Sequence, residues 1–447
     1  MSVDRNTGRF PPLNLLYIAS SINASGRHEA RVADMVLEGE KAVTARVKKF
    51  RPDIAGVRAI SFNILSALET AAVLKKLFPG MPVILGGPHP SVFPEESAGY
   101  DNIDYAVAGE GEKVILELLD RLQADESAEG LKGVAYRKGT GISFNGPAEE
   151  IENIDSLPFP DRKLLNYRKH YNILSNRYPS TTAFSGRGCI HGCSFCYHSF
   201  GRRARLRSPE NVVAEMREVA SLGIKDIFFV DDAFTLDRGR VMDICDLLNK
   251  SEIDLSWAVK SRVDAVDAEM LESMRRAGLT RIHFGIESAS QKTLERVYKG
   301  TAIADGERAL RLAREKGIKV MADFIIGAPG EKYEDALKTI ELAKDLDPDF
   351  ALFNVAMPYP GTRMYKEGVE DGIFNDFWKE FADSPSLSAS IRYWDEMISP
   401  AELELLLKKA NRSFYLRPSY IFRSLIRAGG GRMLLRKARL AFSIWKL

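Results

Sequence analysis

Three of the four cysteines in this 447-residue chain lie within eight residues, at Cys189, Cys193 and Cys196. Their spacing is C-x3-C-x2-C, and a short apolar segment precedes them. Three thiolates so close together predict a loop that binds a metal cluster and leaves one ligand position open. A site with four protein ligands stabilises structure, whereas an open site can bind and activate a small molecule.

The other cysteine and two nearby histidines leave an alternative open. Cys245 lies in the apolar i, i+3, i+4, i+7 pattern of residues 241–248, which predicts the buried face of an amphipathic helix. A structural zinc site with three cysteines and one histidine is the main alternative, because His191 and His198 lie close by. An odd, tightly spaced set of cysteines does not indicate a disulfide framework.

Composition indicates a soluble globular protein with two or three domains. Hydrophobic residues make up 45% and charged residues 28% of the chain, and the net charge is +2. No segment has the pattern of a signal peptide or of a membrane-spanning helix. Few cysteines, used as thiolates, favour a cytoplasmic location.

Residues 180–365 alternate apolar strands with amphipathic helices, which predicts a parallel sheet curled into a partial (β/α)6 barrel of the TIM type. The expected strands are 181–185, 227–230, 257–259, 282–285, 320–326 and 350–356. Reactive groups belong at the carboxyl ends of such strands. The polar residues and glycine expected there are Asp231, Asp232, Arg262, Glu287 and Gly327. Each also has a purely structural interpretation, such as a helix cap or a turn.

The cysteine motif, with Phe195 before its last cysteine, resembles the signature of the radical S-adenosylmethionine (SAM) superfamily. This resemblance implies a [4Fe–4S] cluster that is held by three cysteines, with SAM chelating the remaining iron through its amino and carboxylate groups. It further implies one-electron cleavage of SAM to methionine and a 5′-deoxyadenosyl radical.

The resemblance also assigns SAM contacts at the strand ends. It implies that Asp231 and Asp232 face the methionine amino group, and that Arg262 faces the carboxylate. It implies that Glu287 contacts a ribose hydroxyl or the amino group. By the same likeness Ile325 and Ile326 line the adenine, and Gly327 allows close approach of the backbone. The superfamily's usual Gly-Gly-Glu is absent, and Asp-Asp follows the second strand in its place.

Residues 1–146 predict a doubly wound, Rossmann-like domain. The expected strands are 30–33, 54–60, 82–85 and 105–108, and the expected helices are 13–24, 41–50, 66–77 and 113–122. Segments 11–20, 85–90 and 109–112 resemble the cobalamin-binding domain of many radical SAM enzymes. That likeness implies contacts from Ser61, Gly86 and Gly87 to the corrin or its nucleotide tail, although the two glycines also suit an ordinary turn.

Two departures from the cobalamin pattern stand out. No Asp-x-His-x-x-Gly occurs, so that motif offers no histidine as an axial cobalt ligand. Residues 1–10 are polar and are expected to lack the family's first, central strand, which indicates either an upstream start codon or a degenerate domain.

The remaining segments predict a linker over 147–179 and a helical, basic region over 366–447. Residues 412–447 contain nine arginines or lysines and no acidic residue, interleaved with apolar side chains. This pattern predicts contact with a membrane surface or an anionic ligand, or else a solvated basic face packed on the barrel. Nothing resembles a motif that reads nucleic acid.

These observations predict a cytoplasmic radical SAM enzyme that uses cobalamin to transfer a methyl group to an unactivated carbon. Anaerobic oxidative cyclisation or rearrangement of a tetrapyrrole-like or lipid substrate is the alternative enzyme function. A metal-stabilised binding module is the alternative without catalysis. The expected partners are a small, possibly hydrophobic substrate, an electron donor such as flavodoxin or ferredoxin, and a membrane surface that touches the tail, but no nucleic acid.

Overall fold

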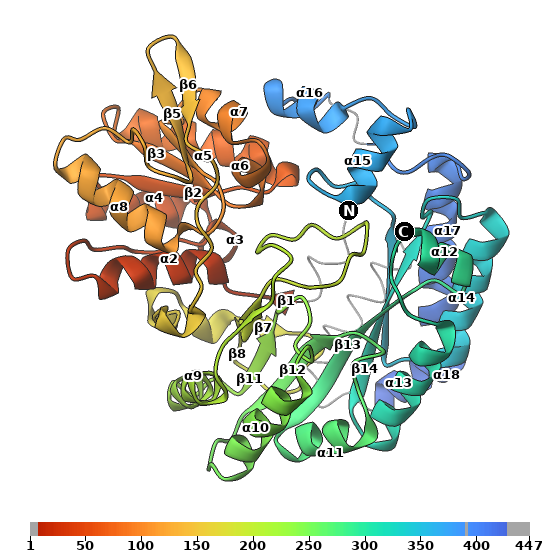
Figure 1. The fold of residues 1–447 in the computed structure, drawn as a ribbon. Coiled ribbons are helices and arrows are strands. Elements are labelled where there is room, and N and C mark those ends of the chain that lie inside the picture. The colour runs from red at the N-terminus through yellow and green to blue at the C-terminus, as the bar shows by residue number, and fades with distance from the viewer. Residues whose placement is uncertain (1–7, 389–391, 427–447) are drawn as a thin grey trace. The chain divides into compact units, whose positions relative to one another are not determined.

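A computed structural model of the chain describes residues 8–388 and 392–426. It divides into two compact units. One unit comprises the described parts of residues 1–11, 167–373 and 392–447, and the other comprises 12–166 together with the described part of 374–391. Each unit is built around its own sheet (Figure 1).

The larger unit contains the expected six-stranded parallel sheet, which confirms the partial-barrel prediction. Its strand order is β15-β14-β13-β12-β11-β8, so every strand pairs with its neighbours in the sequence order of the barrel strands. The strands are β8 (Ser180–Ala183), β11 (Asp226–Phe229), β12 (Ser256–Ser261), β13 (Leu279–Glu287), β14 (Lys319–Ile326) and β15 (Phe350–Val355).

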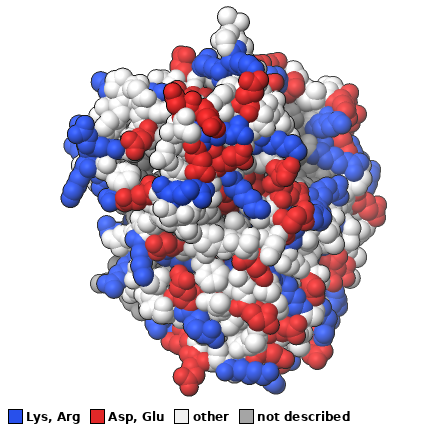
Figure 2. Space-filling view, turned by 60° about the vertical axis from the view of Figure 1, so that its left-hand side comes forward, with Lys and Arg blue, Asp and Glu red and all other residues white. Residues whose placement is uncertain are grey.

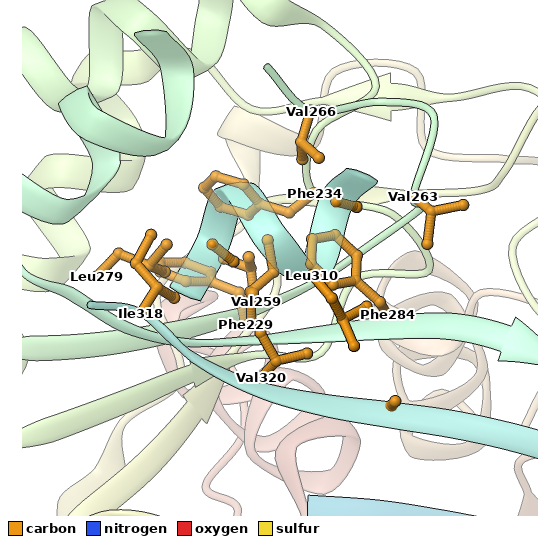
Figure 3. Packing of buried hydrophobic residues seen from close by; sticks show 14 of the residues in the cluster. Phe229, Phe234, Val259, Val263, Val266, Leu279, Phe284, Leu310, Ile318 and Val320 are labelled. Carbon is orange, nitrogen blue, oxygen red and sulfur yellow. The ribbon is translucent and has the colours of Figure 1, made fainter. Parts of the chain in front are cut away.

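Helices cover one face of this sheet, because alternate side chains on each strand are apolar and point that way. Figure 3 shows Phe229, Val259 and Phe284 from three adjacent strands packed together with Leu310 of a covering helix. Cys245 is fully buried in the same core, as its helical pattern predicts. The main helices of this unit are α9 (Pro209–Ser221), α10 (Arg238–Asn249), α11 (Ala268–Arg276), α13 (Ile303–Glu315), α14 (Tyr333–Leu346) and α17 (Pro400–Tyr415).

Side-chain caps fix where the barrel helices begin. Asp237 accepts a hydrogen bond from the Arg240 backbone N–H at 2.9 Å, and Asp267 accepts one from Met270 at 2.8 Å. Such caps satisfy N–H groups that have no partner in the first helical turn. The caps of α10 and α11 thus define where the loops after β11 and β12 end.

The other face of the sheet carries polar and aromatic groups. The Asp226 carboxylate accepts two hydrogen bonds from the Arg281 guanidinium, at 3.0 and 2.8 Å, and one from the Ser256 hydroxyl at 2.7 Å. One step further toward the carboxyl ends, the rings of Phe228 and His283 stack with centroids 4.7 Å apart. These contacts tie β11, β12 and β13 together from the side opposite the helices.

The smaller unit has a five-stranded sheet of order β2-β3-β4-β5-β6. Its first three strands are parallel and its last two form an antiparallel hairpin that the sequence analysis did not predict. The strands are β2 (Ala55–Arg58), β3 (Val83–Gly86), β4 (Tyr105–Val107), β5 (Val134–Lys138) and β6 (Gly141–Phe144). The expected long helices appear as α2 (Leu13–Ala24), α4 (Glu40–Phe50), α5 (Ile64–Leu77) and α8 (Gly111–Gln123).

The prediction of a strand over 30–33 is wrong. Within the described residues β2 is the edge of its sheet, so a strand at 30–33 has no partner beside it. Val32 instead packs against Leu16 and Ala19 of α2, and its carbonyl accepts a hydrogen bond from Arg46 at 2.9 Å. No strand earlier than β2 joins this sheet in the described part of the chain.

The amino-terminal residues that the structure describes contribute to the larger unit. Gly8–Arg9 form the short strand β1, which pairs antiparallel with β7 (Tyr171–Asn172). The expectation that residues 1–10 contain no strand is therefore wrong for residues 8 and 9. The Phe10 ring lies 6.3 Å from the ring of Phe228 on the polar face of the barrel sheet. Residues 1–7 lie outside the described residues.

The carboxyl-terminal region is helical, as predicted, with α15 (Arg363–Glu370), α16 (Phe377–Asp383), α17 and α18 (Pro418–Ile426). Helix α16 belongs to the smaller unit, where Trp378 is fully buried and contacts the Phe62 ring edge-on at 5.3 Å. The expected basic tail beyond residue 426 lies outside the described residues. Among the described helices, none is long and apolar enough to cross a bilayer.

Charges are mixed over the surface. Figure 2 shows lysine and arginine side chains interspersed with aspartate and glutamate over the face in view. Charged side chains of the protein form short ion pairs, such as Arg27 with Asp120 at 2.9 Å and Lys132 with Glu149 at 2.9 Å. Exposed pairs of this kind contribute little to stability.

Candidate active site

The cysteine loop begins directly beyond the carboxyl end of β8. Gly188 has a φ of +83°, and a Cβ atom at this position would lie 2.2 Å from the Arg203 carbonyl oxygen, so only glycine fits here. Two backbone hydrogen bonds anchor the middle of the loop, from Ser194 N–H to Val297 O at 2.9 Å and from Met364 N–H to Ser194 O at 2.8 Å. The loop is therefore held at the strand ends from two sides.

The three thiols of the loop differ in their surroundings. Cys193 is buried, Cys189 is partly exposed and Cys196 is exposed. A hydrogen bond from the Cys196 thiol lowers the pKa of Cys193, and the nearby cations Lys299 and Arg262 act in the same direction. Thiolate is the form of cysteine that binds metals. Burial raises the pKa of Cys189, and the hydrogen bond to Cys193 raises the pKa of Cys196, so of the three thiols only Cys193 favours the thiolate form.

The described side chains do not form a preassembled zinc site. Within the residues that the structure describes, no three histidine, cysteine, aspartate or glutamate side chains converge closely enough to hold one metal ion. The His198 ring is hydrogen-bonded to the His191 carbonyl oxygen at 3.0 Å. A cubane cluster places its irons at separate corners, so its thiolate ligands do not need to meet at one point. Three cysteines on one loop are a donor set that fits a cubane cluster with one iron left open.

Two buried ion pairs lie beside the cysteine loop. Lys299 Nζ donates to Glu287 Oε1 at 2.6 Å, and both side chains are less than a tenth exposed. Arg262 donates to Asp264 through Nε at 2.9 Å and Nη2 at 2.8 Å, and its Nη1 donates to the Lys299 carbonyl at 2.9 Å. Arg262, Asp264 and Glu287 at the ends of β12 and β13 thus meet Lys299 from the loop before α13, so that each cation contacts a carboxylate.

Glu287 and Gly285 have backbones that suit this crowded position. Glu287 has a φ of +68°, which is unusual for a residue with a side chain. A Cβ atom on Gly285 would lie 2.2 Å from Glu287 Oε1 and 2.7 Å from Lys299 Nζ. Glycine at position 285 therefore leaves the space that the ion pair fills.

The two adjacent aspartates after β11 have different environments. Asp231 is buried, and its two carboxylate oxygens accept hydrogen bonds from the Ser185 backbone N–H, at 2.7 Å, and from the Ser185 hydroxyl. Burial raises the pKa of Asp231 to about 6, despite these hydrogen bonds. Asp232 is exposed, and its charge acts on Cys189, His198 and Lys260. Asp231 joins β11 to the start of the cysteine loop, whereas Asp232 remains open to a ligand.

The two isoleucines at the end of β14 point to opposite faces of the sheet. Ile326 is fully buried in the core between the sheet and the helices, so it does not face the side that carries Glu287. Ile325 is partly exposed on the opposite face. Gly327 has a φ of +78°, and a Cβ atom there would lie 2.4 Å from the Leu403 side chain. Helix α17 therefore packs so closely against residue 327 that the position has no room for a side chain.

A buried glutamate follows the same turn. Glu331 Oε2 accepts hydrogen bonds from the backbone N–H groups of Gly327 at 2.6 Å and Ala328 at 3.3 Å, and Ser288 donates to Oε1 at 3.3 Å. Burial raises the pKa of Glu331 to about 7. This carboxyl group fixes the turn after β14 to the segment after β13.

In the smaller unit, Ser61, one of the expected contact residues, belongs to a neutral hydrogen-bonded network with His89 and Tyr100. Ser61 Oγ lies 3.0 Å from His89 Nδ1, and His89 Nε2 lies 3.0 Å from the Tyr100 hydroxyl, which donates to the Ala382 carbonyl at 2.7 Å. His89 is fully buried, and burial lowers its pKa to about 4, so its ring is neutral. This network fixes the loop that follows β3.

The two glycines of that loop differ. Gly87 has a φ of +108°, and a Cβ atom there would lie 2.7 Å from the Ala59 carbonyl, whereas a Cβ on Gly86 would meet nothing within 4 Å. Gly87 therefore sets the turn and the contact between neighbouring loops. Gly86 leaves open space at the strand end, where a ligand can approach.

Sequence reasoning missed three residues of the barrel site, namely Lys299, Asp264 and Glu331. Lys299 lies in a loop between two helices, and no local pattern marks it as buried. Asp264 was passed over because it lies two residues beyond Arg262, although that short spacing allows direct pairing. Glu331 follows a Pro-Gly turn closely, which is a signal for a side chain that binds the turn's N–H groups.

Comparisons with known proteins match both units. Residues 184–343 match the radical SAM superfamily, and residues 3–119 match the B12 binding domain. The chain is 33% identical over 427 residues to an uncharacterized methyltransferase of Pyrococcus horikoshii, which covers 94% of this chain and 91% of the relative. It is 31% identical over 373 residues to the anaerobic magnesium-protoporphyrin IX monomethyl ester cyclase of Rubrivivax gelatinosus, covering 80% of this chain and 66% of the cyclase.

Among solved structures, the fold is similar to the cobalamin-dependent S-adenosylmethionine radical enzyme OxsB with aqua-cobalamin and S-adenosylmethionine bound. The TM-score is 0.73, and the match covers 98% of this chain and 69% of that chain. The identity is 19%, so this likeness concerns the fold.

Proposed function

Because the chain belongs to the radical SAM superfamily and carries a B12-binding domain, we propose that it transfers a methyl group to an unactivated carbon of a small molecule. The observation that carries the proposal is the loop of three cysteines at the carboxyl ends of the parallel half-barrel, beside paired cations and carboxylates. The methyltransferase of Pyrococcus horikoshii aligns over nearly its whole length, which favours methyl transfer over the cyclase alternative.

Cys189, Cys193 and Cys196 would hold the cluster, since they lie together on a loop that backbone hydrogen bonds anchor at the strand ends. When bound, the cluster and SAM supply the electron and the 5′-deoxyadenosyl radical, and cobalamin supplies a methyl carrier. The protein's task is then to hold SAM in one orientation and to keep the reacting carbon close. Both tasks fall to groups at the strand ends.

We assign the SAM contacts on the geometry of each group. Asp232 is the exposed carboxylate that faces the cysteine loop, so it is proposed to bind the methionine amino group in place of Asp231. Ile325 is proposed to contact the adenine. Glu287 keeps one carboxylate oxygen beyond the Lys299 contact for a ribose hydroxyl or the amino group.

Arg262 acts on the SAM carboxylate chiefly through its charge. Its guanidinium has five N–H donors, and Asp264, the Lys299 carbonyl and a longer contact to the Gly300 carbonyl occupy most of them. Arg262 can therefore donate two hydrogen bonds to a second carboxylate only if it gives up its contacts to Asp264. A positive charge next to the loop still attracts the carboxylate of SAM.

Cobalamin is proposed to bind at the strand ends of the smaller unit, where Ser61, Gly86 and Gly87 would hold it, and the histidines of this unit are engaged in contacts within the protein. His89 uses both ring nitrogens in the buried network, and His28 pairs with Asp120 at 2.9 Å. Electron paramagnetic resonance (EPR) of the chain loaded with cob(II)alamin tests this. In protein that contains nitrogen-15 histidine, we expect no nitrogen-15 coupling to the cobalt. Such a coupling would contradict the assignment, whereas a nitrogen-14 splitting comes from the nucleotide base of the cofactor itself.

The test of the main proposal compares two cysteine variants. After anaerobic reconstitution, the wild type and Cys245→Ala should hold about four iron and four sulfide per chain, and Cys193→Ala should lose most of both. Dithionite and SAM should then yield 5′-deoxyadenosine from the first two proteins alone. A wild-type chain with an intact cluster that makes no 5′-deoxyadenosine would contradict the proposal.

The by-products separate the two enzyme functions. A methyltransferase forms S-adenosylhomocysteine as well as 5′-deoxyadenosine, whereas a cyclase forms only the latter. The cyclase remains the second candidate because its identity of 31% extends over 80% of this chain. Lack of S-adenosylhomocysteine with a substrate that is turned over would favour it.

Two partner proposals are tested separately. A flavodoxin or ferredoxin is proposed as electron donor, and either should replace dithionite in the 5′-deoxyadenosine assay.

Membrane contact through the basic tail is supported by Ile421 and Phe422, which α18 exposes. Co-sedimentation with anionic vesicles, and not with neutral ones, is the expected result, and equal partition would rule the contact out.

A further inference from the structure

We propose that Lys299 is a positioning residue that raises the reduction potential of the cluster by placing a fixed positive charge beside the cysteine loop. This inference rests on the proposed function, because it requires that the loop holds a [4Fe–4S] cluster. It assigns a role to a residue that no sequence pattern marks and that the SAM contacts do not use.

The first step is the position of Lys299. The segment 297–299 is fixed to the cysteine loop, because Val297 O accepts a hydrogen bond from Ser194 N–H at 2.9 Å. Ser194 is the residue directly after Cys193. Two residues further on, the Lys299 carbonyl accepts from Arg262 Nη1 at 2.9 Å. The backbone of Lys299 therefore cannot move away from the loop without breaking these contacts.

The second step is the state of its side chain. The Lys299 side chain is only 7% exposed, and its Nζ donates to Glu287 Oε1 at 2.6 Å. Burial alone would lower the pKa of Lys299, but Glu287 and the Cys193 thiolate outweigh it and raise the pKa. The ammonium group therefore stays charged throughout the range in which proteins are studied.

The third step is the local balance of charge. Arg262 is already paired with Asp264, and Lys299 is paired with Glu287, so these four groups are neutral together. Three thiolate ligands add negative charge to the same place. Lys299 donates to one oxygen of Glu287, and its segment is hydrogen-bonded to the residue that follows Cys193, so this cation lies beside the cysteine loop. In a buried site solvent screens the field of this cation weakly.

The fourth step gives the sign. Reduction adds one electron, taken from dithionite or a protein donor, and makes the cluster more negative. A fixed positive charge nearby stabilises the reduced form and thus raises the potential. Removal of the Lys299 charge should lower the potential. Removal of the Glu287 charge should raise it, because the Lys299 ammonium then acts without its partner.

The experiment is a redox titration of the reconstituted full-length chain, followed by the EPR signal of the reduced cluster. Lys299→Met should decrease the ratio of reduced to oxidised cluster about tenfold at a fixed potential, which is about 59 mV for one electron. Glu287→Gln should shift the ratio in the opposite direction, and the double variant should return close to the wild type. Lys299→Arg, which keeps the charge, should also remain close to the wild type.

Lys292→Met is the matched control, because Lys292 is an exposed lysine on the neighbouring helix α12 (Gln291–Arg296). It should leave the potential unchanged. A merely structural role for the ion pair predicts that Lys299→Met and Glu287→Gln shift the potential in the same direction, because both would admit water. That result, or unchanged potentials at equal iron content, would overturn the Lys299 proposal alone. Absence of a reducible cluster in the wild type would overturn the proposed function as well.

Discussion

The two units of this protein place different chemistry at the carboxyl ends of their parallel strands. In the half-barrel, the strand ends hold buried charges in pairs, such as Lys299 with Glu287. In the smaller unit, the loop after β3 holds the neutral network of Ser61, His89 and Tyr100. The first arrangement suits charged ligands, whereas the second fixes the shape of a loop.

The difference shows how each unit is stabilised around its ligand site. Buried charges are costly unless they are paired, so loss of one partner in the half-barrel should have a large effect. A neutral network loses about one hydrogen bond when one member is removed, and its effect should be smaller. Substitutions in the two units can therefore test the comparison directly.

The largest effect is expected for Asp226→Ala, which leaves the Arg281 guanidinium buried and unpaired beneath the barrel site. Breaking a buried pair by removing one partner costs about 3–5 kcal/mol. Urea unfolding, followed by far-UV circular dichroism, measures the loss. Asp254→Ala is the matched control, since Asp254 pairs with Arg177 and Lys225 at the surface and should not shift the curve measurably. A similar shift for both variants would contradict the comparison.

The next effect depends on pH and concerns Glu331, whose pKa is raised to about 7 by burial. The folded state then binds a proton that the unfolded state releases near pH 4.5, so stability should fall as the pH rises from about 4.5 to 7. Glu331→Gln should remove this loss, which is on the order of 3 kcal/mol above pH 7. The amide suits the site, because its oxygen can accept from Gly327 and its nitrogen can donate to Ser288.

Thermal unfolding of the wild type and Glu331→Gln at pH 5 and pH 8 measures this effect. The variant should be more stable than the wild type at pH 8, and the two should converge at pH 5. A variant that is less stable than the wild type at both pH values would show that the carboxylate is ionised in the folded state.

A smaller effect is expected for Tyr100→Phe in the smaller unit. Loss of the hydroxyl leaves His89 Nε2 and the Ala382 carbonyl without this partner, which costs about 1–3 kcal/mol. Tyr105→Phe is the control, since no hydrogen bond of the Tyr105 hydroxyl is seen in the described part of the chain. Limited proteolysis and urea unfolding should both report a change for Tyr100→Phe only. If Tyr100→Phe lowered the free energy of unfolding more than Asp226→Ala does, the expected order of the two units would be reversed.

The half-barrel could be predicted from sequence because its strands are apolar runs between amphipathic helices, a local pattern. The strand over 30–33 failed because strand formation needs a neighbour, and β2 is the edge of its sheet among the described residues. The hairpin β5–β6 was missed because its pairing is antiparallel in a unit expected to be parallel.

The candidate site divides in the same way. The cysteine loop and the strand-end residues were found from motif and position. The partners that decide their roles come from distant segments, such as Ser185 for Asp231 and Lys299 for Glu287. Only the folded chain shows that Asp231 and Ile326 are buried in contacts within the protein, whereas Asp232 is exposed and Ile325 is partly exposed.

The most direct test of the account is electron–nuclear double resonance on the reduced, reconstituted chain with isotopically labelled SAM. The account predicts that nitrogen-15 in the amino group and oxygen-17 in the carboxylate both couple to the cluster, because three thiolates leave one iron for SAM. Absence of both couplings from a chain that holds an intact [4Fe–4S] cluster would contradict it.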